Sequence, residues 1–419
     1  MVVVVSMGGA ISDIFARAIL DSRGNPTVEV DCFVDGVLSG RAAVPSGAST
    51  GTHEAVELRD GGKEWMGKGV QAAIDNVNGP IRDRIVGMDH RNQSKIDNAL
   101  IELDGSPNKE RLGANSTLGV SLACLRAASG GKLWKHLSTG GKISIPVPMM
   151  NILNGGAHAD TNVDVQEFMV IPHGFKSFPI ALRAGVETYH SLKKLLQDEK
   201  LLGGVGDEGG FAPSLPKNEE GLRLVLEAIK RAGYSPGEQI SIALDVAAQE
   251  FFDGEKYHLD GMAVSGSELG RLYSNWINSY PIVSIEDPFG EDDWDSWIEF
   301  NSREGKRIQI VGDDLYVTNP ERLIRGINQA ASNAILIKLN QIGTVSETLE
   351  VIKIAREAGF GTIISHRSGE TSDDAISDIA VGTNAKQIKT GAPARSDRTS
   401  KYNQLIRISE FVEEFSDLF

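Results

Sequence analysis

Six short apolar segments in the second half of the chain each end in an ionisable residue, and their regular spacing constrains the fold more than any other feature. Apart from a first interval of 41 residues, successive ends lie between 23 and 28 residues apart. That spacing accommodates one strand, one turn and one crossover helix of a (β/α) barrel. The longer first interval leaves room for an insertion. The segments are 240–245, 282–286, 308–313, 334–338, 362–366 and 387–389.

The residues between and within these segments support the same α/β barrel. Asn319-Pro320 is a helix start, Thr344 to Glu347 is a capping box, and Gly359 stands where a helix should end. Alternation along each strand separates apolar residues, which we expect to face covering helices, from the terminal charged residues, which we expect inside the barrel. The apolar set is Ile240, Ile242, Leu244, Val283, Ile285, Ile308, Ile310, Ile335 and Ile337.

The first half of the chain has a different pattern and predicts a smaller α+β domain. Residues 13–35 read as two strands joined by a turn at 21–26, and helical periodicity follows near 70–77 and 118–133. The pattern changes after Pro146-Val147-Pro148. We therefore predict an N-terminal extension over residues 1–12, an α+β capping domain over 13–140 and a catalytic barrel over 141–419.

Charge and composition exclude several classes of function. The net charge of −15 provides no basic surface for nucleic acid, so an anionic substrate would need local cations or a metal. The apolar opening at residues 1–5 lacks the basic region of a signal peptide, and no apolar run approaches the ~20 residues of a membrane span. Two isolated cysteines, Cys32 and Cys124, fit a reducing compartment, which predicts a cytoplasmic protein.

Three carboxylates at the predicted barrel rim favour a divalent cation. Asp245, Glu286 and Asp313 end consecutive strands on the same facing. Any one of them alone could be a solvated cap or a salt-bridge partner. Together they form an all-oxygen set that suits Mg²⁺ or Mn²⁺ better than zinc, and without a cation they would repel one another.

Lys338 follows the apolar run 334–337 and is the candidate base. Burial in such a position lowers the pKa of a lysine toward the range of a general base, although a snorkelling surface lysine has the same local pattern. Beside a metal site, a neutral lysine can take a proton from the carbon next to a carboxylate.

The last two strands end in residues suited to an anion. His366-Arg367-Ser368-Gly369 leaves the seventh strand and Lys389 ends the eighth, where barrels often bind phosphate. A surface Arg-Ser loop is the alternative interpretation.

Residues 203–210 contain a literal GxGxxG from Gly204 to Gly209, but Asp207 and Glu208 would repel a pyrophosphate and no helix follows. We instead expect a flexible acidic loop in which the pKa of Glu208 is raised, so that it can donate a proton. His158 and the pair Gln166-Glu167 add further polar groups, although a lone histidine is more often structural. The small-residue loop 46–51 reads as a turn or as a lid.

These segments together resemble the enolase family over about residues 13–410. The resemblance implies a barrel of enolase type, with an irregular ββαα opening that would explain the long first interval. The matching segments are 22–29, 44–51, 166–169, 284–288, 337–344, 365–370, 387–391, 395–398 and 401–405.

The resemblance also implies a role for each candidate residue. Asp245, Glu286 and Asp313 would bind one Mg²⁺, and a second Mg²⁺ would arrive with substrate and take an oxygen from Ser49. Lys338 would remove the C2 proton and Glu208 would protonate the departing C3 hydroxyl. Glu167 would support Glu208, and His158 would help to close the site. The substrate's carboxylate and phosphate would be held by Gln166, Arg367, Ser368 and Lys389, with His366 lining the pocket.

The implied activity is the reversible dehydration of 2-phosphoglycerate to phosphoenolpyruvate, in the cytoplasm, by a homodimer or larger homo-oligomer. Two alternatives stay open at this point. One is a racemase or cycloisomerase of the same superfamily that acts on a carboxylate without phosphate, against which Arg367-Ser368 and Ser49 argue. The other is a binding protein on an inactive scaffold of the same type.

Overall fold

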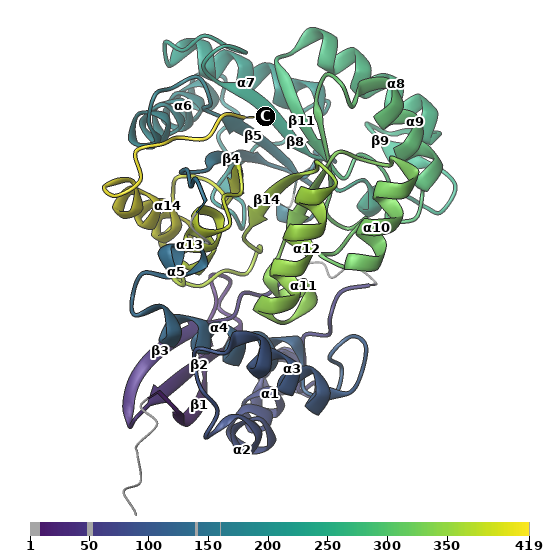
Figure 1. The fold of residues 1–419 in the computed structure, drawn as a ribbon. Coiled ribbons are helices and arrows are strands. Elements are labelled where there is room, and N and C mark those ends of the chain that lie inside the picture. The colour runs from purple at the N-terminus through teal and green to yellow at the C-terminus, as the bar shows by residue number, and fades with distance from the viewer. Residues whose placement is uncertain (1–8, 48–52, 139–140, 160, 419) are drawn as a thin grey trace, which may run out of the picture.

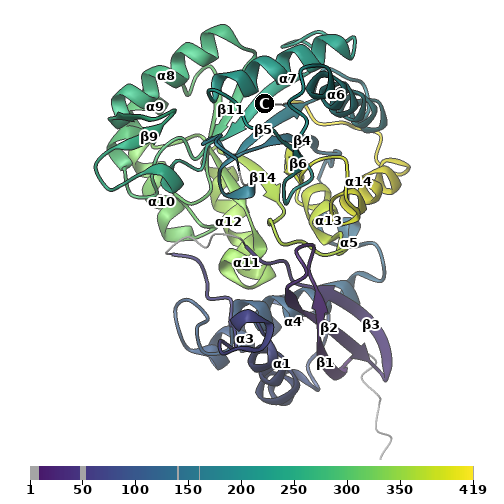
Figure 2. The same cartoon turned by 180° about the vertical axis from the view of Figure 1, so that it is seen from behind.

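The structure, a computed structural model, describes residues 9–47, 53–138, 141–159 and 161–418. Figures 1 and 2 show two bodies, a large barrel ringed by helices and a smaller N-terminal part that packs beneath α11 and α12. Among the described residues, no helix has both the length and the apolar character that crossing a membrane requires.

The N-terminal part is an antiparallel three-stranded sheet with helices on one side. The strands are ordered β1-β2-β3, and α4 packs across β2 and β3 through apolar side chains that include Val30 and Val44. The sheet is formed by β1 (Ile11–Leu20), β2 (Pro26–Val34) and β3 (Val37–Ala43). The helical segments are η1 (Glu64–Gly67), α1 (Gln71–Asn76), η2 (Val77–Ile81), α2 (Arg82–Ile85), α3 (Gln93–Asp104), α4 (Ala114–Ser129) and α5 (Leu133–Leu137).

The remainder is a closed barrel of eight strands. Seven strands are parallel to one another, and β5 runs antiparallel to both of its neighbours, β4 and β8. Pairing of β15 with β4 closes the barrel. In spatial order the strands are β4 (Val147–Asn154), β5 (Glu167–Ile171), β8 (Ser241–Asp245), β11 (Ile282–Glu286), β12 (Gln309–Gly312), β13 (Ala334–Ile337), β14 (Gly361–Ser365) and β15 (Gln387–Lys389). All six strands predicted from the sequence are present, and the barrel prediction is confirmed.

The barrel opens as β4, β5, α6, α7, which is the ββαα order expected from the resemblance. That opening precedes β8, however, so it does not explain the long interval after Asp245; the hairpin β9–β10 and the short helix η4 do. The additional elements are η3 (Gly156–His158), β6 (Gly204–Val205), β7 (Phe211–Ala212), η4 (Ala248–Phe251), β9 (Tyr257–Leu259) and β10 (Met262–Val264).

Helices cover the barrel, and their caps match the sequence signals. Asn319 and Thr344 cap α10 and α12 with their side chains, and Gly359 follows the end of α12 with a positive φ of 75°. The helices are α6 (Phe178–Asp198), α7 (Glu219–Arg231), α8 (Gly266–Ser279), α9 (Trp294–Glu304), α10 (Pro320–Gln329), α11 (Leu339–Ile342), α12 (Val345–Glu357), α13 (Ala375–Gly382) and α14 (Ser396–Ser409).

Two separate apolar clusters establish which way the strand residues face. The interior cluster contains Ala243, Val311 and Leu336, each two residues before one of the predicted charged residues, whereas the predicted helix-facing residues belong to the outer cluster. Val283 is an exception, because it packs against the interior cluster. A register shift between Ile282 and Ser284 interrupts the alternation there.

Candidate active site

The polar residues singled out in the sequence converge at the C-terminal rim of the barrel. Parallel strands deliver Asp245, Glu286 and Lys389 as their last residues. Because β5 is antiparallel, its first residue, Glu167, reaches the same rim, opposite Asp245. One cavity is lined by His158, Gln166, Glu167, Glu208, Asp245, Asp313, Lys338, His366, Arg367, Ser368 and Lys389, among others. Ser49 lies outside the described residues.

Lys389 is at the centre of an acidic cluster. Its ammonium lies 2.8 Å from Asp245 Oδ2, 2.9 Å from Glu286 Oε1 and 3.2 Å from Glu167 Oε1. Burial alone would lower the pKa of Lys389, but these carboxylates outweigh it and hold the pKa well above its usual value. Gln166 donates a further hydrogen bond to Asp245 at 3.1 Å. Two of the three predicted cation ligands therefore meet at one positive charge.

Asp313, the third predicted ligand, pairs with Lys338. The Lys338 ammonium donates to Asp313 Oδ2, and Gln341 donates to Oδ1 at 3.0 Å. Burial is the largest influence and lowers the pKa of Lys338, but the neighbouring acids, Asp313 first and then Glu286, together raise it, so the net shift is upward. The expected lowering of the Lys338 pKa is wrong for this arrangement, because the sequence pattern indicated burial but not the counter-ion.

Two further acids stand behind Asp313 and were missed. Asp287 accepts the backbone N–H groups of Asp313 and Asp314 at 2.9 and 2.8 Å, which fixes the turn after β12. Burial raises the pKa of Asp287 well above its ordinary value, and burial together with Asp313 raises that of Asp314 to about 8. Each follows a predicted ligand directly in the sequence. A pair of consecutive acidic residues at the end of a strand could therefore have indicated both.

The loop that carries Glu208 is held in place on several sides. Gly206 N–H donates to Gly210 O at 2.8 Å, Ala392 N–H donates to Glu208 O at 2.9 Å, and the Tyr189 hydroxyl donates to Gly209 O at 2.9 Å. Glu208 itself is only 2% exposed. The flexible loop expected from the sequence is therefore the turn of a hairpin between β6 and β7, and residues 208–210 of this turn are buried. No helix follows it, which agrees with the rejection of the GxGxxG reading.

Two histidines flank the carboxylate of Glu208. His366 Nε2 is 3.3 Å from Glu208 Oε2, and Asn151 donates to the same oxygen at 3.0 Å. His158 Nδ1 lies between two acids, 3.5 Å from Glu167 Oε1 and 3.7 Å from Glu208 Oε1. Burial lowers the pKa of His366 to about 3, so this ring is neutral.

These neighbours separate the two glutamates electrostatically. Burial raises the pKa of Glu208, but the His366 and His158 rings, a hydrogen bond from His366 and the charge of Arg398 together outweigh it, and the net pKa falls well below the usual value. Burial and the charge of Glu208 raise the pKa of Glu167 well above its usual value. The predicted raised pKa of Glu208 is thus wrong here. A proton shared by this coupled pair resides on Glu167.

Arg367 links the barrel rim to the N-terminal part of the chain. Its Nη1 donates to Glu54 Oε2 and to Asn340 Oδ1, both at 2.9 Å. Glu54 is 8% exposed and also accepts from Gln341 at 3.3 Å. Nothing in the sequence pattern around Glu54 marked it as a site residue. Ser368 lines the cavity beside Arg367, as predicted.

The donor set fits a hard divalent cation. The cluster contains eight carboxyl groups and three lysine or arginine side chains, and burial first, then Asp245, raises the pKa of Glu286 well above its ordinary value. This excess of buried acid over base favours an added cation with oxygen ligands. The acids are Glu54, Glu167, Glu208, Asp245, Glu286, Asp287, Asp313 and Asp314; the bases are Lys338, Arg367 and Lys389.

The fold and the site define a barrel enzyme that moves protons on an anionic substrate. The description "Enolase, C-terminal TIM barrel domain" matches residues 142–417, and "Enolase, N-terminal domain" matches residues 11–137. An enolase from Acidothermus cellulolyticus is 56% identical over 407 residues, which cover 96% of this chain and 95% of that protein. The chain belongs to the enolase family.

Proposed function

We propose that this chain catalyses the reversible dehydration of 2-phosphoglycerate to phosphoenolpyruvate, a carbon–oxygen lyase reaction of glycolysis and gluconeogenesis. The observation that carries the proposal is the convergence of Lys338, Glu208 and the acidic cluster on one cavity in a chain of this family. Neither a racemase of the same superfamily nor a purely binding role is favoured by any feature of the site.

Lys338 acts as the base that removes the C2 proton. In the structure its ammonium is stabilised by Asp313. If Asp313 served as a cation ligand, it would stabilise the proton on Lys338 less. Burial then dominates and lowers the pKa of the amine, which is what a general base requires.

Glu208 acts as the acid that protonates the departing C3 hydroxyl, so that water leaves. Glu167 supports this step by holding the proton of the pair at rest, since its pKa is the raised one. His158, placed between the two carboxylates, relays that proton to Glu208 and helps to close the site. His366 lines the pocket and presents its neutral ring to Glu208.

Membership of the enolase family implies dependence on Mg²⁺, and we propose Asp245, Glu286 and Asp313 as the ligands of one ion. A cation held there supplies positive charge for the substrate carboxylate and for the enolate formed at C2. A second Mg²⁺ that arrives with substrate, with an oxygen ligand from Ser49, completes the proposal.

The substrate's carboxylate and phosphate replace protein carboxylates as the partners of Arg367 and Lys389. Arg367 leaves Glu54 for the substrate, because a dianionic phosphate offers its guanidinium more charge than one carboxylate does. Ser368 and Gln166 add neutral donors from the cavity wall. Lys389, which pairs with Asp245 and Glu286 in the structure, would be free to contact the substrate if those carboxylates held a cation.

The test measures turnover of 2-phosphoglycerate with and without a chelator, for wild type and for Lys338→Ala. We expect turnover that requires a divalent cation and that falls by roughly 10²–10⁴-fold or more in the variant. Lys353→Ala is the matched control, since Lys353 is 60% exposed and, among the described residues, forms its one ion pair with Glu350 on the same helix. Near-normal turnover by Lys338→Ala would refute the assignment of the base.

A second measurement separates base from acid. Exchange of the C2 proton with deuterated water, followed by NMR, needs Lys338 but not Glu208. We expect Glu208→Gln to retain exchange while losing elimination, and Lys338→Ala to lose both. Loss of exchange in Glu208→Gln alone would reverse the proposed roles.

We also propose a cytoplasmic location, a homodimer or larger assembly, and a domain boundary at residues 140/141. Cys32 and Cys124 are unbonded although their sulfur atoms lie 3.8 Å apart, which supports a reducing compartment. Phe15 and Leu20 are 46% and 60% exposed on the N-terminal sheet and supply apolar surface for a subunit contact. Cell fractionation and light scattering test the first two points, and expression of residues 141–419 alone tests the boundary.

A further inference from the structure

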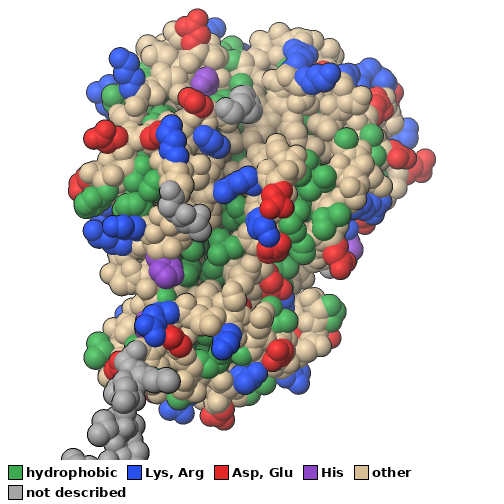
Figure 3. All heavy atoms as spheres, viewed as in Figure 1, with side chains coloured by type: hydrophobic (Ala, Val, Ile, Leu, Met, Phe, Trp, Pro, Cys, Tyr) green, Lys and Arg blue, Asp and Glu red, His purple; other side chains and the backbone are tan. Residues whose placement is uncertain are grey.

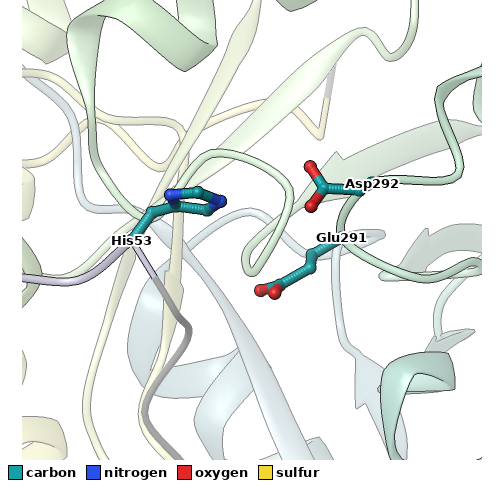
Figure 4. A group of neighbouring side chains, drawn as sticks. All are labelled: His53, Glu291 and Asp292. Carbon is teal, nitrogen blue, oxygen red and sulfur yellow. The ribbon is translucent and has the colours of Figure 1, made fainter.

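Two loops from different parts of the chain bring three metal-ligating side chains together outside the proposed catalytic cluster. His53 precedes Glu54 in the N-terminal part, and Glu291 and Asp292 lie in the turn between β11 and α9. One ligand atom from each residue lies within 4.8 Å of the other two. Figure 4 shows the imidazole ring and the two carboxylates pointing toward one another.

We propose that His53, Glu291 and Asp292 form a separate site for a zinc-like divalent cation, which ties the N-terminal part of the chain to the rim of the barrel. One imidazole and two carboxylates are ligands that Zn²⁺ accepts readily, with water in the fourth position. The catalytic cluster, in contrast, presents only oxygen ligands at Asp245, Glu286 and Asp313. The two sites therefore differ in chemistry.

Only a small movement is needed to close the ligands around an ion. Zinc bonds of about 2.0–2.2 Å in a tetrahedron put neighbouring ligand atoms roughly 3.4 Å apart. In the structure the three ligand atoms lie within 4.8 Å of one another. His53 and Asp292 are exposed and can change rotamer without disturbing packed neighbours. Two carboxylates balance the charge of one divalent cation.

The backbone on both sides of the site is held firmly. On the barrel side, Glu291 N–H donates to Gln249 at 3.1 Å, and Arg322 donates to Glu291 O at 2.6 Å. On the other side, the Glu54 side chain, directly after His53, is bound to Arg367, and the backbone is held at the next residue, where Ala55 N–H donates to Gln341 O at 2.8 Å. A cation would therefore bridge two anchored backbones, which reduces the entropy lost on binding.

Arg322 competes with a cation for Asp292. It pairs with Asp292 Oδ1 at 3.1 Å, but the Asp292 side chain is 64% exposed, and such an exposed pair contributes little to stability. Arg322 also stacks over the Trp294 ring and donates to Leu315 O, so it has other partners when Asp292 turns to the ion.

The experiment titrates Zn²⁺ alone into protein in saturating Mg²⁺, by calorimetry, for wild type, His53→Ala, Asp292→Asn and two control variants. Mg²⁺ occupies the oxygen cluster during the titration. His158→Ala is needed because His158, Glu167 and Glu208 form another histidine–carboxylate group. His258→Ala is the matched control, since His258 is exposed and lies 2.6 Å from Asp253 but belongs to none of the groups of three among the described residues.

We expect His53→Ala to lose one equivalent of bound Zn²⁺ and Asp292→Asn to weaken that equivalent by about tenfold or more. His158→Ala and His258→Ala should keep it. Chemical modification of His53, followed by mass spectrometry, should be slowed by Zn²⁺ in wild type but not in Asp292→Asn. If wild type binds no Zn²⁺, or if His53→Ala binds as much as wild type with equal affinity, the proposal is overturned.

Discussion

At the scale of single residues, Asp378 on α13 couples protonation to stability. Its carboxylate accepts from Trp134 N–H at 3.1 Å and from Gln404 at 2.9 Å, and burial raises its pKa from 3.8 to about 6. Between these values the unfolded chain loses the Asp378 proton while the folded chain keeps it. The free energy of unfolding therefore falls as pH rises from about 4 to 6, by at most about 3 kcal/mol, and then levels off.

We predict that Asp378→Asn removes this component of the pH dependence. Thermal unfolding midpoints measured from pH 4 to pH 7 should show wild type losing stability relative to the variant as pH rises. Asp75→Asn, at an exposed position on α1, is the control and should follow wild type. Parallel pH profiles for wild type and Asp378→Asn would contradict the assignment.

The identities of the site residues could be predicted from sequence, but their protonation could not. Lys338 and Glu208 were placed correctly in the cavity, because strand ends and a glycine-rich turn are local patterns. Their pKa shifts depend on Asp313 and His366, which come from other segments and arrive only when the barrel closes. Glu54 was not predicted as a site residue for the same reason, since its partner Arg367 is more than 300 residues away in the sequence.

At the scale of elements, parallel strands with a buried apolar run can be predicted from the sequence, whereas a reversed strand or a register shift cannot. The strand that ends at Lys338 was evident from four apolar residues and one charge. The direction of β5, and with it the position of Glu167, follows from pairing with β4 and β8 rather than from its own sequence. Val283 was misplaced because a register shift leaves no local signal.

The contact between β3 and α4 supplies an element-scale prediction. A Cβ added at Gly40 on β3 would lie 2.0 Å from Ala123 O and 2.6 Å from Ala127 N, both backbone atoms of α4. Because neither backbone atom can move without displacing the helix, we expect Gly40→Ala to cost roughly 1–3 kcal/mol or more. The midpoint of thermal unfolding should fall accordingly.

A matched substitution separates this clash from the general effect of replacing glycine. Gly204 on β6 has no described atom within 4 Å of an added Cβ and no left-handed φ. Gly204→Ala should change stability by no more than about 0.5 kcal/mol. Equal unfolding midpoints for the two variants would show that β3 and α4 do not pack as closely as the structure indicates.

At the scale of the whole molecule, charge is distributed unequally between surface and site. Figure 3 shows acidic and basic side chains interspersed on the face in view, whereas the buried cluster holds an excess of acid. Polar contacts also join the two bodies: Lys109 pairs with Glu347 at 2.5 Å, and Thr117 donates to Gly343 O at 2.8 Å. These contacts couple the stability of the N-terminal part to that of the barrel.

Because the buried acidic cluster is expected to bind Mg²⁺ only in the folded state, we predict that Mg²⁺ stabilises the folded chain. A ligand that binds only the folded state adds RT ln(1 + [L]/Kd), about 2.7 kcal/mol at a concentration one hundred times Kd. We expect the midpoint of thermal unfolding to rise by a few degrees with Mg²⁺ and to return to its starting value with chelator. Glu286→Gln, which removes a ligand oxygen charge at a fully buried position, should abolish the response.

Glu255→Gln makes the same chemical change at an exposed position and should leave the Mg²⁺ response intact, which separates ligation from general charge screening. Screening by salt acts mainly on exposed charges such as that of Glu255, whereas ligation needs the buried carboxylate at the end of β11. If Glu286→Gln retains the full rise in unfolding midpoint, the stabilising ion binds elsewhere and Glu286 is not its ligand. If only Glu286→Gln loses the rise, the excess of buried acid at the rim is balanced by Mg²⁺ bound there.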